Sequence, residues 1–419
     1  MQKFLIKGNR ALKGEIQISG AKNAALPILA AAIMLPGRSV IRNVPNLLDV
    51  TTIIRVLRAL GLKAEYSQSK PNTVNVWNYQ VKHVAPYELV TKMRASFFVI
   101  GPILAVKGLA KIPLPGGCAI GSRPVDIHIK GLEALGAKVE LEHGFVIAKA
   151  DKLRGGKIYF DFPSVGATES VIMAAALADG ETVIENAARE PEIIDLANFL
   201  NKAGAKIEGA GKEIIHIQGV NSLAPVDHAI IPDRIEAGTM MMAAAITRGD
   251  MKIGGIVPEH IEATVRKLQE SGIYVELDGD SVRVKNDDGF RSVDVKTLPY
   301  PGFPTDMQPQ FTSLLCLAKG TSVITETVFE NRFMHLQELK RMGADIRLEG
   351  QSAIISGVEK MSGAPVRVPD LRAGAALILA GLAAEGETLL EDRDHHINRG
   401  YEKLLEKLSA LGADIKKVS

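Results

Sequence analysis

Near its C-terminus the chain reads Leu411-Gly412-Ala413-Asp414, and this short stretch decides how the sequence is divided. Leu404 and Leu408 precede it at the spacing of one helix face, and a strand-like run follows it. Glycine after the last helical turn accepts the left-handed backbone of a helix cap. The stretch therefore predicts a helix that ends at a glycine and turns directly into a strand.

The same signature recurs along the whole chain. Its glycines are 68 to 75 residues apart and are Gly61, Gly136, Gly204, Gly272, Gly343 and Gly412. A second series, in which alanine-rich apolar helices end before a strand-like run, is spaced by 66 to 72 residues, at Gly37, Gly108, Gly180, Gly249, Gly320 and Gly386. Two independent landmarks with one period predict six repeated units of about 70 residues, grouped into closed α/β domains.

The alanine-rich helix of each unit is apolar on nearly all sides, which is typical of a buried helix. If the units are equivalent, polar residues occupy matching places at the starts of these helices. They are Lys22, Arg94, Ser164, Asp233, Asp306 and Arg372. Helix capping explains serine and aspartate there, whereas lysine and arginine oppose the helix dipole. We therefore expect an anion to bind among the cations.

The composition is that of an ordinary globular protein, with 46% hydrophobic and 23% charged residues. A net charge of +2 argues against a nucleic acid or an anionic membrane surface as partner. Two cysteines do not make a disulfide framework, which favours a reducing, cytoplasmic location. The N-terminus alternates like a strand, lacks the pattern of a signal peptide, and no apolar run is long enough to span a membrane.

The stretch from Pro113 to Asp126 places Cys118 among glycines and Arg123 before Pro124. A proline followed by an acid can open a helix, whose free N–H groups attract anions. A surface hairpin with a chance cysteine explains the stretch equally well. Its glycine spacing is like that of a P-loop, but Ser122-Arg123 replaces the required lysine and hydroxyl, so nucleotide hydrolysis is not expected. Cys316, in an apolar segment, is interpreted as a buried core thiol.

Seven motifs occur in collinear order from one end of the chain to the other: Ser19–Ala24, Pro115–Cys118, Gly121–Asp126, Ala187–Glu192, Phe303–Gln308, Phe329–Phe333 and Asn398–Tyr401. Together they resemble the UDP-N-acetylglucosamine 1-carboxyvinyltransferase family. The resemblance implies two inside-out α/β barrel domains of three units each, with helices inside, sheets outside and the active site in the interdomain cleft. It implies domains 21–229 and 1–20 with 230–419.

The resemblance also implies a reaction. The enolpyruvyl group of phosphoenolpyruvate is transferred to the 3′-hydroxyl of UDP-N-acetylglucosamine, and phosphate is released through a tetrahedral ketal. This is the first committed step of peptidoglycan precursor synthesis. The chemistry contains no redox step, so no nicotinamide or flavin is needed. Neither a cofactor nor a metal is expected. The alternatives are 3-phosphoshikimate 1-carboxyvinyltransferase and a catalytically silent protein that binds a UDP-sugar; the oligomeric state is not indicated.

Residue roles follow from the same resemblance. It implies that Cys118 is a reactive thiol that can protonate the methylene carbon and can also add covalently to the phosphoenolpyruvate carbon as a phospho-ketal thioether. It implies that Asp306, otherwise a plain helix cap, takes the hydroxyl proton. The implied catalytic residues are Cys118, Asp306, Lys22 and Arg399. The residues implied for phosphoenolpyruvate are Lys22, Asn23, Arg123, Arg372 and Arg399. Those implied for UDP-N-acetylglucosamine are Asn23, Arg94, Arg123, Pro124, Val125, Asp126, Ile127, Ser164, Val165, Gly166, Asp306 and Val328.

Other positions carry weaker expectations. Phe162 stands where some family members have a phosphate-contacting lysine. The stretch Asp161-Phe162-Pro163-Ser164 resembles the variant of Gram-positive members, so Phe162 is left out of the site. Arg332 is a candidate partner of Asp306 or of the substrate. Four acids are either near the site or structural ion-pair partners: Glu190, Glu192, Asp233 and Glu236.

Overall fold

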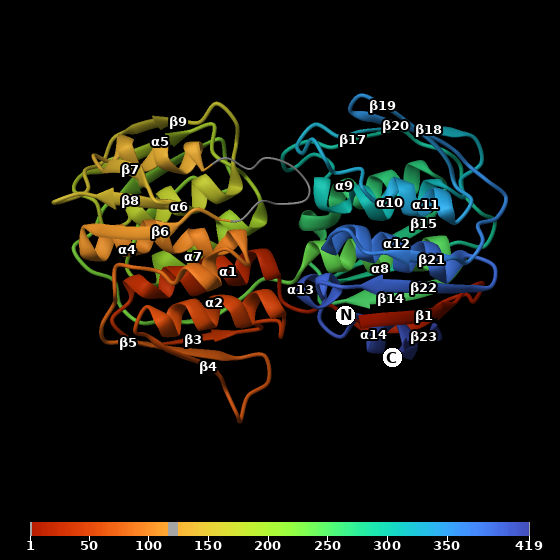
Figure 1. Cartoon of the computed structure of the whole chain (residues 1–419), viewed down its shortest axis with the longest axis horizontal. Coiled ribbons are helices and arrows are strands. Elements are labelled where there is room, and N and C mark those ends of the chain that lie inside the picture. The colour runs from red at the N-terminus through yellow and green to blue at the C-terminus, as the bar shows by residue number, and fades with distance from the viewer. Residues whose placement is uncertain (1, 116–124, 419) are drawn as a thin grey trace. The chain divides into compact units, whose positions relative to one another are not determined.

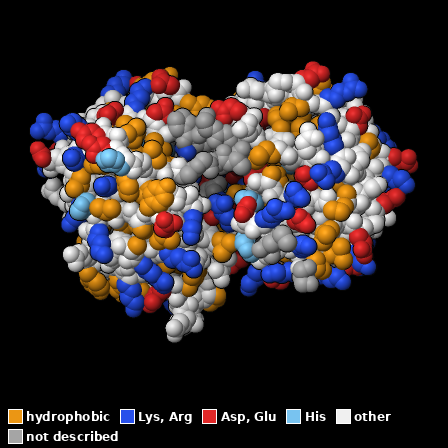
Figure 2. Space-filling model, in the orientation of Figure 1, with side chains coloured by type: hydrophobic (Ala, Val, Ile, Leu, Met, Phe, Trp, Pro, Cys, Tyr) orange, Lys and Arg blue, Asp and Glu red, His pale blue; other side chains and the backbone are white. Residues whose placement is uncertain are grey.

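The computed structural model describes residues 2–115 and 125–418. The chain forms two compact units (Figure 1), which we call the N-unit (residues 20–115 and 125–231) and the C-unit (residues 2–19 and 232–418). Each unit has its own hydrophobic core. No helix among the described residues is long and apolar enough to cross a membrane. On the face drawn in Figure 2, basic and acidic side chains are interspersed over each unit.

The N-unit contains three small sheets. Their strand orders are β13 (Asp227–Ala229), β3 (Gly37–Arg42), β5 (Val74–Asn78), β4 (Lys63–Tyr66); β6 (Leu109–Pro113), β8 (Phe145–Lys149), β7 (Lys138–Glu142); and β11 (Lys206–Glu208), β12 (Ile214–Gln218), β10 (Glu181–Glu185), β9 (Lys157–Tyr159). The first and third sheets are mixed, with one parallel pair each. The second has an isolated parallel bridge from Val84 to Lys111 where the others have a fourth strand.

The C-unit repeats the pattern with three four-stranded sheets. Their strand orders are β21 (Pro365–Arg367), β22 (Glu387–Asp392), β1 (Gln2–Lys7), β23 (Asp414–Val418); β15 (Tyr274–Asp278), β16 (Ser281–Lys285), β14 (Asp250–Gly254), β2 (Lys13–Gln17); and β17 (Val295–Lys296), β18 (Thr321–Thr325), β20 (Ser352–Ser356), β19 (Asp345–Glu349). In each sheet the strand that follows a buried helix pairs in parallel with one neighbour and antiparallel with the other. Six small mixed or antiparallel sheets are what six repeated units predict.

Helices lie between the sheets of each unit (Figure 1). Those of the N-unit are α1 (Lys22–Ala31), η1 (Ala32–Met34), α2 (Leu48–Ala59), α3 (Tyr87–Val90), η2 (Arg94–Val99), α4 (Ile100–Lys107), α5 (Asp126–Ala134), α6 (Val165–Ala175) and α7 (Pro191–Lys202). Those of the C-unit are α8 (Arg234–Ile246), α9 (Pro258–Glu270), η3 (Thr305–Met307), α10 (Gln308–Leu315), α11 (Leu336–Arg341), α12 (Leu371–Ala383), α13 (His396–Gly400) and α14 (Leu404–Ala410). The apolar helices α8, α10 and α12 pack against one another and are buried over almost their whole length.

The first glycine series behaves as predicted, because all six members have a positive φ, between 85° and 105°. The second series holds at five positions and fails at Gly249. There the left-handed residue is Arg248, with φ 53°, one position earlier. Gly249 is required for a different reason: a Cβ atom at this position would lie 2.2 Å from the carbonyl oxygen of Leu12. Close approach of two backbones, and not chain reversal, explains this glycine.

The predicted equivalence of the helix starts also needs correction. Ser164 and Asp233 are N-caps, of α6 and α8. In α12 the capping residue is Asp370, so Arg372, two residues further on, does not occupy the matching place. Asp306 caps neither η3 nor α10, since the flanking positions are Pro304 and Met307 and neither makes a side-chain cap.

Candidate active site

Asp306 lies in the short helix η3 of the C-unit and joins two buried arginines. Its Oδ1 accepts a hydrogen bond from Nη2 of Arg332 at 2.9 Å, and its Oδ2 accepts one from Nη2 of Arg372, also at 2.9 Å. The arginine side chains are each 2% exposed, whereas Asp306 is 24% exposed. Two guanidinium groups stabilise the negative charge of the carboxylate. The accessible carboxylate is therefore held in one orientation as an acceptor.

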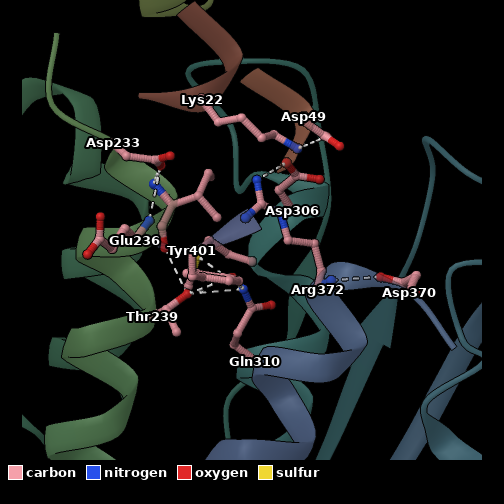
Figure 3. Close-up of polar contacts among 12 residues, drawn as sticks. Lys22, Asp49, Asp233, Glu236, Thr239, Asp306, Gln310, Asp370, Arg372 and Tyr401 are labelled. Atoms are coloured by element: carbon pink, nitrogen blue, oxygen red, sulfur yellow. Dashed lines mark hydrogen bonds and ion pairs between the residues drawn. The ribbon is translucent and has the colours of Figure 1, made fainter. Parts of the chain in front are cut away.

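Arg372 is supported by neighbours within the C-unit (Figure 3). Oδ1 of Asp370 accepts hydrogen bonds from two backbone N–H groups at the start of α12, 2.8 and 3.1 Å away. The guanidinium carbon of Arg372 lies 5.4 Å from the ring centre of Tyr401, within cation–π distance. The Tyr401 hydroxyl is in turn 3.0 Å from Nε2 of Gln310 and 3.2 Å from Oγ1 of Thr239. The arginine is thus positioned at both its backbone and its head group.

Arg372 remains charged, and some of its N–H groups are available to bind a ligand. Burial lowers the pKa of its guanidinium, but Asp306, Tyr401 and Asp233 together raise it further than burial lowers it, so the net shift is upward. Among the described residues, no hydrogen-bond partner reaches its Nε and Nη1 atoms. Because arginine binds carboxylates and phosphates through paired N–H donors, this side chain suits an anionic ligand.

Two further predicted residues also belong to the C-unit. Val328 is half-buried, and its backbone N–H donates to Oε1 of Glu326 at 2.9 Å. Arg399 is half-buried in the last turn of α13. The carboxylate of Asp392 fixes the start of that helix by accepting hydrogen bonds from two backbone N–H groups, at 2.8 and 3.0 Å.

Lys22 is the first residue of α1 in the N-unit and is 7% exposed. Its Nζ lies 3.4 Å from Oδ2 of buried Asp49 on α2, an ion pair that offsets a cation at a helix N-terminus. Asn23 follows Lys22 and is half-buried. Gly20 makes the approach to α1 possible, because a Cβ there would lie 1.7 Å from the carbonyl oxygen of Asn43.

The predicted nucleotide residues that the structure describes in the N-unit lie mainly at the starts of η2, α5 and α6. Nδ1 of His128 on α5 is 2.9 Å from Oγ of Ser170 on α6, which joins the two helices. A side chain at Gly166, in the first turn of α6, would meet the His128 ring at 3.1 Å. Burial, helped by the charge of Arg94, lowers the pKa of His128 to about 3, so the ring is neutral. The sequence did not predict a role for His128, because the adjacent motif suggested function through its charged residues and its helix start.

The His128–Ser170 contact joins α5 to α6, and the Phe97 ring of η2 lies 5.3 Å from the His128 ring, centre to centre. Arg94 begins η2, and Ser164 caps α6 by accepting a hydrogen bond from a backbone N–H at 3.4 Å. The other half-buried or exposed members are Val125, Asp126, Ile127, Val165 and Gly166. Two helix N-termini and an arginine are suited to a negatively charged nucleotide. Phe162, left out of the site, is 40% exposed beside this turn.

The weaker acidic candidates serve structural roles in part. Asp233 caps α8, and Glu236 forms a buried ion pair with Lys407 of α14. Lys407 also donates to Oγ of Ser19 at 2.7 Å. Burial raises the pKa of Glu236 to about 6 although Lys407 opposes this.

The other two acids, Glu190 and Glu192, lie close to buried Glu169 of α6. Burial, and next the charges of Glu192 and Glu190, raise the pKa of Glu169 well above its usual value. Burial and two neighbouring acids both disfavour the charged form of this carboxyl.

Cys118, Arg123 and Pro124 lie outside the described residues. Cys316 is confirmed as a core thiol: it is fully buried in the turn after α10, and its Sγ donates to the backbone oxygen of Thr312 at 3.2 Å. Burial raises the pKa of Cys316 to about 12.

Comparison with known proteins identifies the family to which this chain belongs. A family model described as EPSP synthase (3-phosphoshikimate 1-carboxyvinyltransferase) matches residues 6–408. UDP-N-acetylglucosamine 1-carboxyvinyltransferase 1 of Caldanaerobacter subterraneus subsp. tengcongensis is 55% identical over 414 residues, covering 99% of each chain. The corresponding protein of Geobacter metallireducens is 55% identical over 419 residues, covering 100% of both chains. The chain belongs to the UDP-N-acetylglucosamine 1-carboxyvinyltransferase family.

Solved structures agree with this assignment at the level of the fold. The enolpyruvyl transferase NikO from Streptomyces tendae has a TM-score of 0.89 and 27% identity, over 100% of this chain and 99% of its own. EPSP synthase from Acinetobacter baumannii has a TM-score of 0.76 and 18% identity, over the full length of both chains. The carboxyvinyltransferase chain therefore has the α/β enolpyruvyl transferase fold.

Proposed function

We propose that this chain transfers the enolpyruvyl group of phosphoenolpyruvate to the 3′-hydroxyl of UDP-N-acetylglucosamine and releases phosphate. The observation that carries the proposal is the accessible carboxylate of Asp306, fixed by buried Arg332 and Arg372 in a chain of this family. A fixed carboxylate suits proton removal from a hydroxyl, and the neighbouring guanidinium groups suit an anionic donor substrate. In a bacterial cell the product enters peptidoglycan synthesis.

In the proposed mechanism the C-unit supplies the base and part of the anion site. Asp306 takes the proton of the sugar hydroxyl as the oxygen bonds to C2 of phosphoenolpyruvate. Arg372 binds the donor through its remaining N–H groups, and Arg399 neutralises further negative charge. Val328 contacts the sugar. No step requires oxidation or reduction, because only C–O bonds and protons are exchanged.

The N-unit supplies the remaining contacts. Lys22 and Asn23 contact the substrates at the start of α1. Arg94 and the starts of α5 and α6 hold the uridine nucleotide. We propose domains 21–229 and 1–20 with 230–419, built inside-out with helices within, which both contribute residues to one active site. Nucleotide-sugar and phosphoenolpyruvate substrates favour a cytoplasmic location.

Cys118 completes the proposed chemistry. Its thiol gives a proton to the methylene carbon during addition, which forms the tetrahedral phospho-ketal. The methyl group then returns a proton to the Cys118 thiolate as the C–O bond to phosphate breaks, which yields the enol ether and free phosphate. Arg123 helps to bind the substrates. An epoxide phosphonate that mimics phosphoenolpyruvate is expected to alkylate Cys118 in the presence of the UDP-sugar, whereas buried Cys316 serves as an unreactive internal control.

The rival acceptor is shikimate 3-phosphate, whose enzyme gives its name to the matching family model. The full-length relatives at 55% identity favour the UDP-sugar, whereas the EPSP synthase structure is only 18% identical.

The test is phosphate release from phosphoenolpyruvate with each acceptor in turn. We expect release that depends on UDP-N-acetylglucosamine and none with shikimate 3-phosphate. Binding of the UDP-sugar without release would instead identify a silent binding protein, and release with shikimate 3-phosphate would identify the rival enzyme.

A further inference from the structure

Glu326 lies directly after β18 and is 2% exposed. Its Oε1 accepts hydrogen bonds from Oγ1 of Thr297 at 2.9 Å and from the backbone N–H groups of Val328 and Phe329 at 2.9 and 3.3 Å. Its Oε2 accepts one from Oγ1 of Thr305 at 2.9 Å. A buried carboxylate is costly unless such bonds satisfy it. Glu326 is therefore committed to these donors.

The donors belong to two segments with proposed roles at the acceptor sugar. Thr305 immediately precedes Asp306 in η3, and Val328 is a proposed sugar contact. The segment η3 is a single turn, and its N-cap residue, Pro304, makes no side-chain cap. The hydroxyl of Thr305 therefore gives this turn an anchor that its own helix does not supply. One carboxylate thus holds both segments.

We propose that Glu326 is a positioning residue for the acceptor sugar, which fixes the distance between the Asp306 carboxylate and the turn at Val328. The inference rests on the proposed function and extends it to a residue that does not itself contact the substrate. Thr297 strengthens the same junction, because its Oγ1 also accepts the backbone N–H of Thr327 at 2.9 Å.

Two substitutions of Glu326 separate the effect of its hydrogen bonds from the effect of its negative charge. Glu326→Ala removes all four bonds. Glu326→Gln can keep them, because its amide oxygen can replace Oε1 while its NH₂ group donates to the Thr305 hydroxyl, which can also accept. A third substitution, Thr305→Val, removes only the hydrogen bond between Thr305 and Oε2 of Glu326, which anchors the turn that carries Asp306.

Asn286 offers a matched control in the same unit. It is 3% exposed, its Nδ2 donates to the backbone oxygen of Ala245 at 2.6 Å, and its Oδ1 accepts from the backbone of Gly289 at 3.0 Å. It therefore ties two segments together as Glu326 does, but neither segment has a proposed role in the reaction.

The test combines steady-state phosphate release, varying each substrate, with calorimetric binding of UDP-N-acetylglucosamine and thermal denaturation. For Glu326→Ala we expect kcat to fall and the KM and Kd for the UDP-sugar to rise, each by about tenfold or more, as for lost hydrogen bonds to a charged group. The KM for phosphoenolpyruvate should stay within about twofold of wild type. Glu326→Gln should retain near-wild-type constants, and Thr305→Val should lower kcat with little effect on the KM for the sugar.

Asn286→Ala should lower the Tm without changing kcat or the KM and Kd for the UDP-sugar. The inference is overturned if Glu326→Ala behaves like Asn286→Ala, if both KM values change equally, or if Glu326→Gln is as impaired as Glu326→Ala. If Glu326→Ala does not fold, an unchanged kcat in Thr305→Val overturns it alone. Failure of the proposed function is distinct: wild type itself would then release no phosphate with the UDP-sugar.

Discussion

Asp306 illustrates how one side chain can hold a structure together and take part in a reaction. Removing its charge leaves Arg332 and Arg372 buried with no compensating carboxylate between them, which is far more costly than losing an exposed ion pair. A simple alanine substitution would therefore mix loss of the base with loss of the fold. The functional role has to be tested with the shape of the side chain preserved.

We expect Asp306→Asn to lower kcat about 100-fold or more, the contribution of a general base, and to reduce stability by about 3–5 kcal/mol, as for a broken buried ion pair. Adding Arg332→Met removes one uncompensated charge and should restore part of the Tm but none of the activity. Phosphate release and calorimetric unfolding measure the two effects. A wild-type kcat in the Asp306→Asn variant would contradict the role of Asp306 as the base.

His128 gives a second prediction, on pH. Its pKa is about 3 in the folded chain, mainly because of burial, against about 6.5 when unfolded. Between these values the unfolded chain binds the extra proton, so stability is lost as the pH falls below 6.5, by about 1 kcal/mol for each pH unit.

Because glutamine does not titrate, His128→Gln should weaken the dependence of the free energy of unfolding on pH between 6.5 and 5. Urea denaturation of both proteins, followed by a signal from the N-unit, measures the difference. Parallel curves for wild type and variant would show that His128 does not titrate on unfolding.

At the scale of elements, the repeat fixes backbone geometry more strictly than side-chain chemistry. The left-handed glycine after a helix recurs in all six members of one series. The polar residues at the buried helix starts instead diverge: Ser164 and Asp233 cap helices, Asp306 does not, and Arg372 follows a cap. Equivalent elements can therefore carry different chemistry, because a few residues at the helix start are free to change.

The two glycine roles in the second series can be separated by experiment. Gly386 has φ 88° and open space around it, so Gly386→Ala should cost about 1–2 kcal/mol from left-handed backbone strain. Gly249→Ala should cost more, because the added Cβ would lie 2.2 Å from the Leu12 backbone oxygen and must displace β2 from β14. Chemical denaturation compares the two variants. Equal losses would contradict close approach as the reason for Gly249.

At the scale of the whole molecule, the C-unit is assembled from two distant stretches of chain. β1 pairs antiparallel with both β22 and β23, so the first strand of the sequence is an interior strand of its sheet. Phe4 and Ile6 of this strand are buried in the core. The N-terminal residues are therefore part of the C-unit, in which Asp306 lies.

Deletion of residues 2–7 should therefore destabilise the C-unit strongly, because two buried side chains alone contribute about 3–6 kcal/mol and β22 and β23 lose their common partner. Deletion of residues 414–418 removes the edge strand β23 and should cost less. Hydrogen exchange of the β22 amides measures both effects. Equal protection in the two variants would contradict the interior role of β1.

The sequence alone determined the period of about 70 residues, the buried alanine-rich helices and the motifs that place the chain in its family. These features are local: glycine spacing and apolar periodicity depend on residues within one or two turns. The same spacing could not separate the capping aspartates from Asp306, and it pointed to Gly249 for the wrong reason.

Tertiary structure decided which side chains meet. The sequence suggests Arg332, 26 residues away, as a partner of Asp306 or of the substrate, and the structure confirms the contact with Asp306. Only the structure shows that Asp306 also contacts Arg372, 66 residues away. Glu326 and His128 carry no local motif, and their importance becomes visible only through the segments that they join. Such contacts are set by how the sheets and helices of one unit close around a core, because packing in three dimensions brings together residues that no sequence period relates.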